Sequence, residues 1–242
     1  MIKNFKNSPD SPAFKKAYNR ELFTEVAPQY DRITKILSLG HDAGWKRRLI
    51  ALLPSKNYSN CLDIACGTGD VTFSLAQQFP QAHIEGIDLT PEMITYAYNK
   101  NSYANVTFSL GDMCQLTQQP ESVDLVTGGY ALRNAPDLSI AFDQIHKVLK
   151  PGGIAAFLDF SKPTSQVLQK AEYYLLKMWG GLWGLVFHKN PSVYGYIAES
   201  LARYPDRQEL HELLTKSGFD VLTTQRLFGG ITEIIICSKR DK

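Results

Sequence analysis

Residues 61–70 read Cys-Leu-Asp-Ile-Ala-Cys-Gly-Thr-Gly-Asp, and this stretch decides the fold. An apolar run broken by one acid, Asp63, predicts a buried strand over residues 60–65. Gly67 and Gly69 predict a tight turn after it. The turn then opens a helix over residues 70–79. A strand, a glycine turn and a helix in this order are typical of α/β proteins that bind an adenosine cofactor.

The residues after the turn favour one class of ligand. In a dinucleotide-binding loop the third glycine would fall on Thr72, and the pyrophosphate would lie beside the helix N-terminus, where this chain has Asp70. A carboxylate there repels phosphate, but it suits a ligand with an ammonium and a sulfonium, which describes S-adenosylmethionine. The alternative is that Asp70 only complements the helix dipole.

A second acid follows at the expected distance along the chain. Residues 82–88 alternate like a strand and end in Asp88, nineteen positions after Gly69. At this spacing a carboxylate meets the ribose hydroxyls of an adenosine at the tip of the neighbouring strand. We therefore predict that Asp88 binds the ribose. The alternative is a turn or helix-start role, because Thr90 and Pro91 make a good N-cap and first helical residue.

Composition narrows the class of protein. The 242 residues, 44% of them hydrophobic, fit one α/β domain with additions. The formal net charge is +2, and the basic clusters at residues 46–48 and 239–240 are short, so we expect them on solvated surface and expect no nucleic-acid partner. The four cysteines match neither a metal site nor a disulfide framework, and suit a reducing cytoplasm. The polar N-terminus lacks a signal peptide's apolar stretch, and we expect disorder up to about Ala13.

Helices and strands alternate along the rest of the chain. The patterns predict helices over residues 20–38, 43–53, 91–100, 137–149 and 206–217, and strands over residues 83–88, 105–110, 123–128, 154–160, 219–226 and 231–238. Residues 151–153, Pro-Gly-Gly, are a stop signal after the fourth of these helices. The last two strands should close the sheet as an antiparallel pair. Parallel sheets bind ligands at the carboxyl ends of their strands, so one rim should gather residues 66–70, Asp88, Asp112, Gly129 and Asp159.

Four blocks of sequence resemble one enzyme family. They are Tyr30-Asp31 with Ser38-Leu39-Gly40 and Trp45-Lys46, the Gly-Thr-Gly-Asp loop, Ala131-Leu132-Arg133-Asn134, and residues 147–163, from Lys-Val-Leu-Lys-Pro-Gly-Gly to Asp-Phe-Ser-Lys-Pro. Residues 196–205 and 217–219 carry later landmarks. Over about residues 22–238 the chain resembles the quinone-biosynthesis C-methyltransferases of the UbiE/COQ5 family, which methylate ubiquinone and menaquinone precursors. The Arg-Asn and Ser-Lys-Pro blocks are its specific marks.

The chain also departs from the family pattern. Ile33-Thr34 stands where the family usually has Met-Asn, and Asp42 stands where it commonly has a His. Ala131 replaces the usual Gly. Lys147 and Asp159 replace the usual Arg and Glu. These changes fall mostly around the methyl acceptor, so they concern the choice of substrate more than methyl transfer.

The resemblance implies an α/β fold, the Rossmann-like, seven-stranded sandwich of class I methyltransferases. It divides the chain into an N-terminal tail and helical lid (1–55), a cofactor-binding core (56–163), a helical substrate cover inserted after the fifth strand (164–203) and a C-terminal helix with the antiparallel strands (204–242).

The resemblance also places S-adenosylmethionine among named residues, Thr68, Asp88, Asp112, Met113 and Gly129. Asp63, Gly67, Gly69 and Leu89 complete the predicted cofactor site. Asp112 at a strand end suits the adenine amino group, and Met113 suits the adenine face. The alternative for Asp112 is ordinary turn chemistry.

The implied reaction is attack of an electron-rich carbon on the sulfonium methyl, with no metal. Arg133 is the best candidate to stabilise a phenolate on the acceptor, with Asn134 fixing the ring or a water; the alternative for Arg133 is a structural ion pair with an acid of the rim. Tyr30, Asp31 and His41 come from the lid, where each is a base or a packing or capping residue. His188 and Tyr194 are weaker candidates in the cover.

Residues 173–187 of the cover are apolar but too short to cross a membrane. They either line a pocket for a hydrophobic, prenylated aromatic substrate or pack into the core. A peripheral membrane contact and a homodimer both stay open. The expected function is C-methylation of a hydroquinone or naphthol ring in menaquinone or ubiquinone biosynthesis. The alternatives are a methyltransferase of specialised metabolism and a non-catalytic cofactor-binding assembly protein.

Overall fold

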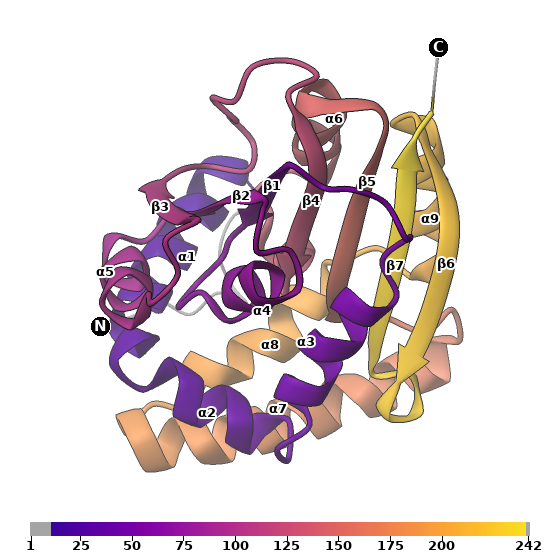
Figure 1. Cartoon of the computed structure of the whole chain (residues 1–242). Coiled ribbons are helices and arrows are strands. Elements are labelled where there is room, and N and C mark those ends of the chain that lie inside the picture. The colour runs from indigo at the N-terminus through magenta and orange to yellow at the C-terminus, as the bar shows by residue number, and fades with distance from the viewer. Residues whose placement is uncertain (1–10, 241–242) are drawn as a thin grey trace.

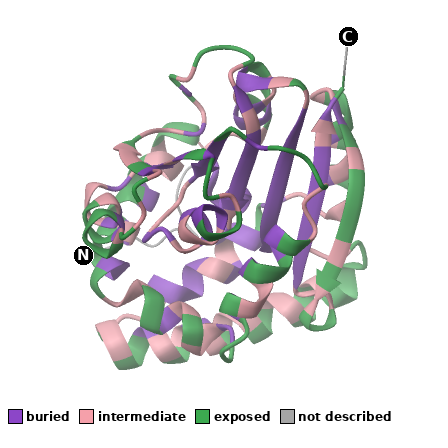
Figure 2. Ribbon diagram, viewed as in Figure 1, coloured by how far each residue is buried: buried purple, intermediate pink, exposed green. Residues whose placement is uncertain are grey.

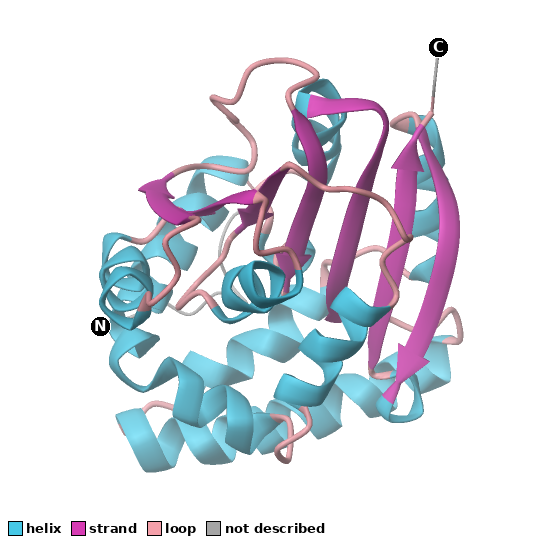
Figure 3. Cartoon of the chain, viewed as in Figure 1, coloured by secondary structure: helices cyan, strands magenta, loops and turns pink. Residues whose placement is uncertain are grey.

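The computed structural model describes residues 11–240, which form one seven-stranded sheet with helices on both faces (Figures 1 and 3). The strands are β1 (Asn60–Ile64), β2 (His83–Asp88), β3 (Val106–Leu110), β4 (Val123–Gly129), β5 (Leu149–Phe160), β6 (Phe219–Leu227) and β7 (Thr232–Lys239). Their order in the sheet is β3-β2-β1-β4-β5-β7-β6. The first five are parallel, and β7 is antiparallel to both β5 and β6. The predicted α/β fold and its antiparallel closing pair are confirmed.

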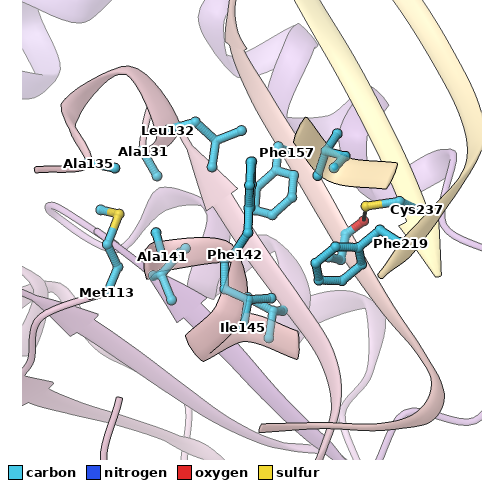
Figure 4. Packing of buried hydrophobic residues seen from close by; sticks show 14 of the residues in the cluster. Met113, Ala131, Leu132, Ala135, Ala141, Phe142, Ile145, Phe157, Phe219 and Cys237 are labelled. Carbon is cyan, nitrogen blue, oxygen red and sulfur yellow. Dashed lines mark hydrogen bonds between the residues drawn. The ribbon is translucent and has the colours of Figure 1, made fainter. Parts of the chain in front are cut away.

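Helices bury both faces of the sheet. They are α1 (Pro12–Val26), α2 (Tyr30–Leu37), α3 (Asp42–Ala51), α4 (Asp70–Gln78), α5 (Pro91–Lys100), α6 (Leu138–Val148), α7 (Gln166–His188), α8 (Ser192–Ala202) and α9 (Arg207–Lys216). On one face α6 and the C-terminal strands share a core in which Phe142, Phe157 and Phe219 meet (Figure 4). On the other face α3 and α4 pack on the strands. The central strands are buried, whereas the outer helices keep exposed sides (Figure 2).

The N-terminal segment differs from expectation. Disorder was expected up to Ala13; residues 1–10 lie outside the described part, but Ser11 already caps α1, its hydroxyl accepting from the amide of Phe14 at 3.2 Å. The helix expected over residues 20–38 is two helices, because the turn at Ala27–Gln29, which contains Pro28, separates α1 from α2. Together α1, α2 and α3 form the layer that we call the lid. It lies over the carboxyl ends of the parallel strands (Figure 1).

Glycines shape two further segments, one in β5 and one in α7. Residues 151–153 do not form a loop but lie inside β5, where the pairing with β4 shifts register between Val123 and Leu125. In α7, the glycines do not break the helix. A Cβ on Gly184 would lie 2.6 Å from the carbonyl oxygen of Asn190, and one on Gly180 would collide with that of Tyr194. These glycines let α7 press against α8, and the two helices form the cover.

Candidate functional site

The carboxyl ends of the parallel strands form a rim, and the glycine loop lies at its centre. The loop needs left-handed backbone: φ is +48° at Ala65, +57° at Gly67 and +94° at Gly69. At Gly69 a side chain is also excluded sterically, because a Cβ would lie 2.8 Å from the Phe73 ring. Gly69 then serves as the N-cap residue of α4. The loop therefore brings bare backbone to the rim, as a closely approaching ligand requires.

Asp88 is anchored at this rim by the loop itself. Its Oδ2 accepts from the amide of Gly67 at 2.9 Å, and its Oδ1 accepts from the amide of Thr90 at 2.9 Å. The side chain is buried, and this burial raises the pKa of the carboxyl against the two amide bonds. Each carboxylate oxygen keeps a further acceptor site, so Asp88 fits a bidentate hold on ribose hydroxyls.

A small cavity of about 60 Å³ gathers most of the predicted cofactor residues. Gly67, Asp88, Leu89, Asp112, Met113 and Gly129 all line it. Their chemistry fits an adenosine, since the carboxylates can accept from ribose hydroxyls and from an adenine amino group, and Met113 offers an apolar surface to a ring. An adjoining space of about 20 Å³ over the loop is lined by Asp63, Thr68 and Asp70.

Two other predicted cofactor residues, Asp63 and Thr68, use their side-chain oxygens in contacts that hold the loop in place. Asp63 is fully buried and accepts from the hydroxyls of Thr72 at 2.6 Å and Thr127 at 2.7 Å. Burial raises its pKa to about 6 in spite of these bonds. The Thr68 hydroxyl donates to Asp31 of α2 at 2.5 Å, so this residue fastens the lid to the loop.

The lid contributes residues that sequence reasoning did not find. From α1, Asn19, Arg20 and Phe23 line the small cavity, and Lys16 forms an ion pair with Asp112, Nζ to Oδ2 at 2.6 Å. The Ser11–Pro12 pair, an N-cap followed by a first-turn proline, was the signal for this helix.

A second, larger cavity of about 390 Å³ adjoins the small one. Its walls are mostly aliphatic and aromatic and come from the lid, the cover and the turn before β7; they include Leu22, Ile33, Trp45, Trp179 and Val193. Three residues, Phe23, Tyr30 and Tyr130, line both cavities. They mark the junction at which a bound cofactor and an acceptor would meet.

Arg133 lies on the wall of the large cavity and is buried. Its Nη1 donates to Ser200 Oγ at 3.1 Å and to Asn134 Oδ1 at 3.3 Å, and its Nε lies 3.5 Å from Asp159 Oδ1. The guanidinium also lies 5.2 Å from the centre of the Phe160 ring. The structure thus contains the ion pair of the alternative interpretation, and it also places the guanidinium beside the cavity.

Asn134 lines the small cavity and belongs to a buried network that the sequence did not reveal. Its backbone carbonyl accepts from Nδ2 of Asn19 at 2.7 Å, and its Oδ1 accepts from the Tyr196 hydroxyl at 3.2 Å. The same hydroxyl donates to Asn19 Oδ1 at 2.5 Å. Lid, rim and cover are therefore joined at Asn134.

A second buried network corrects one expectation. Lys46, expected on a solvated surface, is only 6% exposed. Its Nζ lies 2.7 Å from Asp42 Oδ2 and 2.9 Å from Asp70 Oδ2. Asp42 in turn accepts from the Tyr130 hydroxyl at 2.9 Å. Asp42, one of the departures from the expected family pattern, therefore lies inside this buried network.

The remaining candidates are His41 of the lid and His188 and Tyr194 of the cover. His41 is exposed and stacks on Trp45, with ring centres 5.9 Å apart. Its ring also contacts Phe228 at a tilt, with centres 5.5 Å apart, and it lines neither of the two cavities. His188 contacts the Tyr194 hydroxyl at 2.7 Å and Glu25 at 3.3 Å, which holds the cover against α1. Of these residues, Tyr194 lines the large cavity.

Known proteins share this architecture. Over residues 12–239 the chain matches the ubiE/COQ5 methyltransferase family. A demethylmenaquinone methyltransferase of Staphylococcus aureus is 30% identical over 224 residues, 92% of each chain. A chain from the complex between the Haloferax volcanii Trm112 methyltransferase activator and a methyltransferase has a TM-score of 0.67 at 16% identity; the match covers 90% of this chain and 98% of that chain. A SAM-dependent methyltransferase from Aquifex aeolicus has a TM-score of 0.60 at 16% identity, and the match covers 80% of this chain and 89% of the Aquifex chain. The chain belongs to the ubiE/COQ5 methyltransferase family and is an S-adenosylmethionine-dependent methyltransferase.

Proposed function

We propose that this enzyme methylates a ring carbon of a hydroquinone or naphthol that carries an apolar chain, as a step of menaquinone or ubiquinone biosynthesis. The observation that carries the proposal is the apolar cavity of about 390 Å³ beside the cofactor rim. A polar acceptor would leave its hydrogen-bonding groups unpaired against such walls, whereas a prenylated aromatic would bury its apolar surface against them. The name of the Staphylococcus aureus relative, a demethylmenaquinone methyltransferase, favours the same acceptor.

The residues around the cavity suit this chemistry. Asp88, Asp112 and the glycine loop would hold the cofactor, which would supply an electrophilic methyl group. Attack from carbon requires electron density, which the ring gains when its hydroxyl loses a proton. An arginine guanidinium stays protonated in proteins, so Arg133 would stabilise the phenolate, and a water held beside Asn134 would take the proton. Tyr30 and Tyr130 would confine the ring between the cavities and exclude water, and this alignment contributes ~7–11 kcal/mol in well-oriented reactions.

The test compares acceptors in reduced and oxidised form. The purified chain is incubated with methyl-labelled S-adenosylmethionine and a prenylated naphthoquinol, its oxidised quinone, or a small unprenylated phenol. We expect a C-methylated product from the quinol, little from the phenol and none from the quinone, because the quinone has no hydroxyl to ionise. Fragmentation in the mass spectrometer distinguishes carbon from oxygen methylation. Methylation of the small phenol in preference to the prenylated quinol would overturn the proposal.

A further inference from the structure

The outer side of α7 is apolar and uncovered in the described chain. Eight large apolar side chains of this helix are each more than half exposed: Val167, Leu168, Tyr174, Leu175, Met178, Leu182, Leu185 and Val186. We call them the α7 face. Their spacing of three and four residues places them along one stripe. The helix packs on α8 through Gly180 and Gly184, which lie on the opposite side of α7 from this stripe. The α7 helix itself lies at the edge of the molecule (Figure 1). Contiguous exposed apolar surface of this kind marks an interaction site.

The α7 face continues into the mouth of the large cavity. Leu175 belongs to the face, is 55% exposed and also lines the cavity. Two more exposed apolar residues line it from other segments, Leu39 after α2 and Phe228 before β7. On the proposed function, the apolar chain of an acceptor that exceeds the cavity would leave along this face. A partner that covers the face must therefore accept an apolar chain.

The charges around the α7 face are basic. Lys170 and Lys189 stand near the ends of the stripe, and both are exposed. On the neighbouring α2, Arg32 and Lys35 are exposed, and the Arg32 guanidinium lies 5.3 Å from the centre of the Phe187 ring of α7. The two acids of these helices do not offset this charge, because Asp31 pairs with Lys100 and Glu172 is half-buried.

These observations assign the face an occupant. We propose that the α7 face lies on the surface of an anionic lipid bilayer, with the apolar stripe in the acyl boundary and the four basic residues at the headgroups. Apolar stripes with basic borders bind membranes in this way. A second copy of the chain fits less well, since a twofold dimer would place two basic borders against each other and would cap the cavity mouth. None of the helices between residues 11 and 240 is long and apolar enough to cross a membrane, so the proposed contact is peripheral.

Vesicle sedimentation without any substrate tests the contact independently of the reaction. The full chain is mixed with vesicles of phosphatidylcholine alone or of phosphatidylcholine with phosphatidylglycerol. We expect binding to the anionic vesicles, lost in the double variant Met178→Glu/Leu182→Glu. The matched control is Tyr98→Glu/Leu222→Glu, which changes two apolar residues that are 71% and 50% exposed on α5 and β6. Lys170→Gln/Lys189→Gln should weaken binding to anionic vesicles by roughly 10- to 30-fold.

Three results would overturn the proposal: no binding to anionic vesicles, equal losses in the test and control variants, or a stable dimer in light scattering that Met178→Glu/Leu182→Glu dissociates. Methylation of a short-chain, water-soluble quinol is measured on the same variants. We expect it to be unchanged, because Met178 and Leu182 do not line the large cavity. Vesicle binding by a chain that methylates no quinol would support the surface and count against the proposed function alone.

Discussion

Lys46 pairs with Asp70, Nζ to Oδ2 at 2.9 Å, and this ion pair joins the lid to the first residue after the glycine loop. Lys100 approaches the other oxygen of the same carboxylate at 3.3 Å. Burial opposes the charge on both partners, but the attraction of Asp70 and Asp42 raises the pKa of Lys46, and Lys46 lowers the pKa of Asp70. Asp70 is therefore not the free carboxylate expected to receive a ligand's ammonium, because two lysines already neutralise it.

We expect Lys46→Met to lower the free energy of unfolding by about 3–5 kcal/mol, the usual cost of leaving a buried charge without its partner, here Asp42. Lys100→Met is the matched control, since Lys100 contacts the same carboxylate but its side chain is 35% exposed. It should cost less than about 1 kcal/mol. Urea unfolding of the three proteins measures both values, and equal losses would show that Lys46 is not the buried link described here.

Asp88 should govern cofactor binding. S-adenosylmethionine at a hundred times its dissociation constant should stabilise the chain by ~2.7 kcal/mol, visible as a raised melting temperature, whereas NAD should not. Asp88→Ala should remove most of this shift. Asp124→Ala is the control, because Asp124 also accepts from two backbone amides, those of Ser59 and Asn60, but from the opposite end of β1. It should reduce stability and keep the shift; loss of the shift in both variants would point to general destabilisation instead.

Asp63 makes stability depend on pH. Its pKa of about 6 in the folded chain lies above the value of roughly 3.9 for an unfolded aspartate. The folded state therefore binds the proton more tightly, so the stability that this group contributes is present below about pH 4 and is lost as the pH rises through about 6. As the pH rises through this window, the free energy of unfolding of Asp63→Asn should therefore increase relative to that of the native chain by on the order of 3 kcal/mol.

The control for Asp63 is Asp124→Asn, measured by urea unfolding at both ends of the window. Burial opposes ionisation of Asp124, but its hydrogen bond from Lys150 lowers the pKa. Its contribution is therefore present above the unfolded pKa and is lost as the pH falls, so this variant should change in the opposite sense. A gain for Asp63→Asn that does not vary with pH would exclude titration of Asp63 as the cause.

Local sequence was enough for the sheet and the glycine loop. The period of two in residues 82–88 and the Gly-Thr-Gly turn are set by short-range chemistry, so β2 and the start of α4 could be predicted. The prediction of a single helix over residues 20–38 was wrong. Helix propensity alone did not show that Pro28 would lie in a short 3-10 turn between two helices.

Contacts between distant segments could not be predicted. Lys46 looks like part of a basic surface cluster in sequence, and only the approach of α3 to the glycine loop buries it. Asn19 and Tyr196, which meet at Asn134, are 177 positions apart and belong to the lid and the cover. A single sequence carries no signal for such a pairing, whereas the tips of neighbouring strands meet by a general rule of parallel sheets.

Tyr30 should act through its ring rather than as a base. Burial raises its pKa to about 12, so the phenolate is scarce at neutral pH. Tyr30→Phe should keep turnover within a few-fold of the native enzyme, while Tyr30→Ala should lose much of it, because the ring lies at the junction of the two cavities. Turnover with saturating quinol and cofactor measures this. A drop of roughly 10² or more in Tyr30→Phe would instead assign a proton-transfer role to the hydroxyl.

Arg133 offers the sharpest test of the site. If its guanidinium stabilises the phenolate, Arg133→Ala should lower turnover by roughly 10²–10⁴ while cofactor affinity changes little. Lysine should rescue poorly, because it keeps the charge but lacks the planar fork that can serve Asp159 and a phenolate together. Ser200→Ala is the control, since it removes one guanidinium partner at 3.1 Å and leaves the charge in place.

The ion pair with Asp159 predicts a different pattern for the same variants. A residue that only holds the rim together would, when replaced by alanine, reduce the free energy of unfolding and weaken cofactor binding. Turnover of the saturated enzyme would then stay near normal. Measuring unfolding, cofactor affinity and saturated turnover on Arg133→Ala separates these roles. A stable variant with lost turnover identifies the guanidinium as catalytic. An unstable variant with near-normal turnover removes it from the reaction and leaves the ion pair with Asp159 as its role.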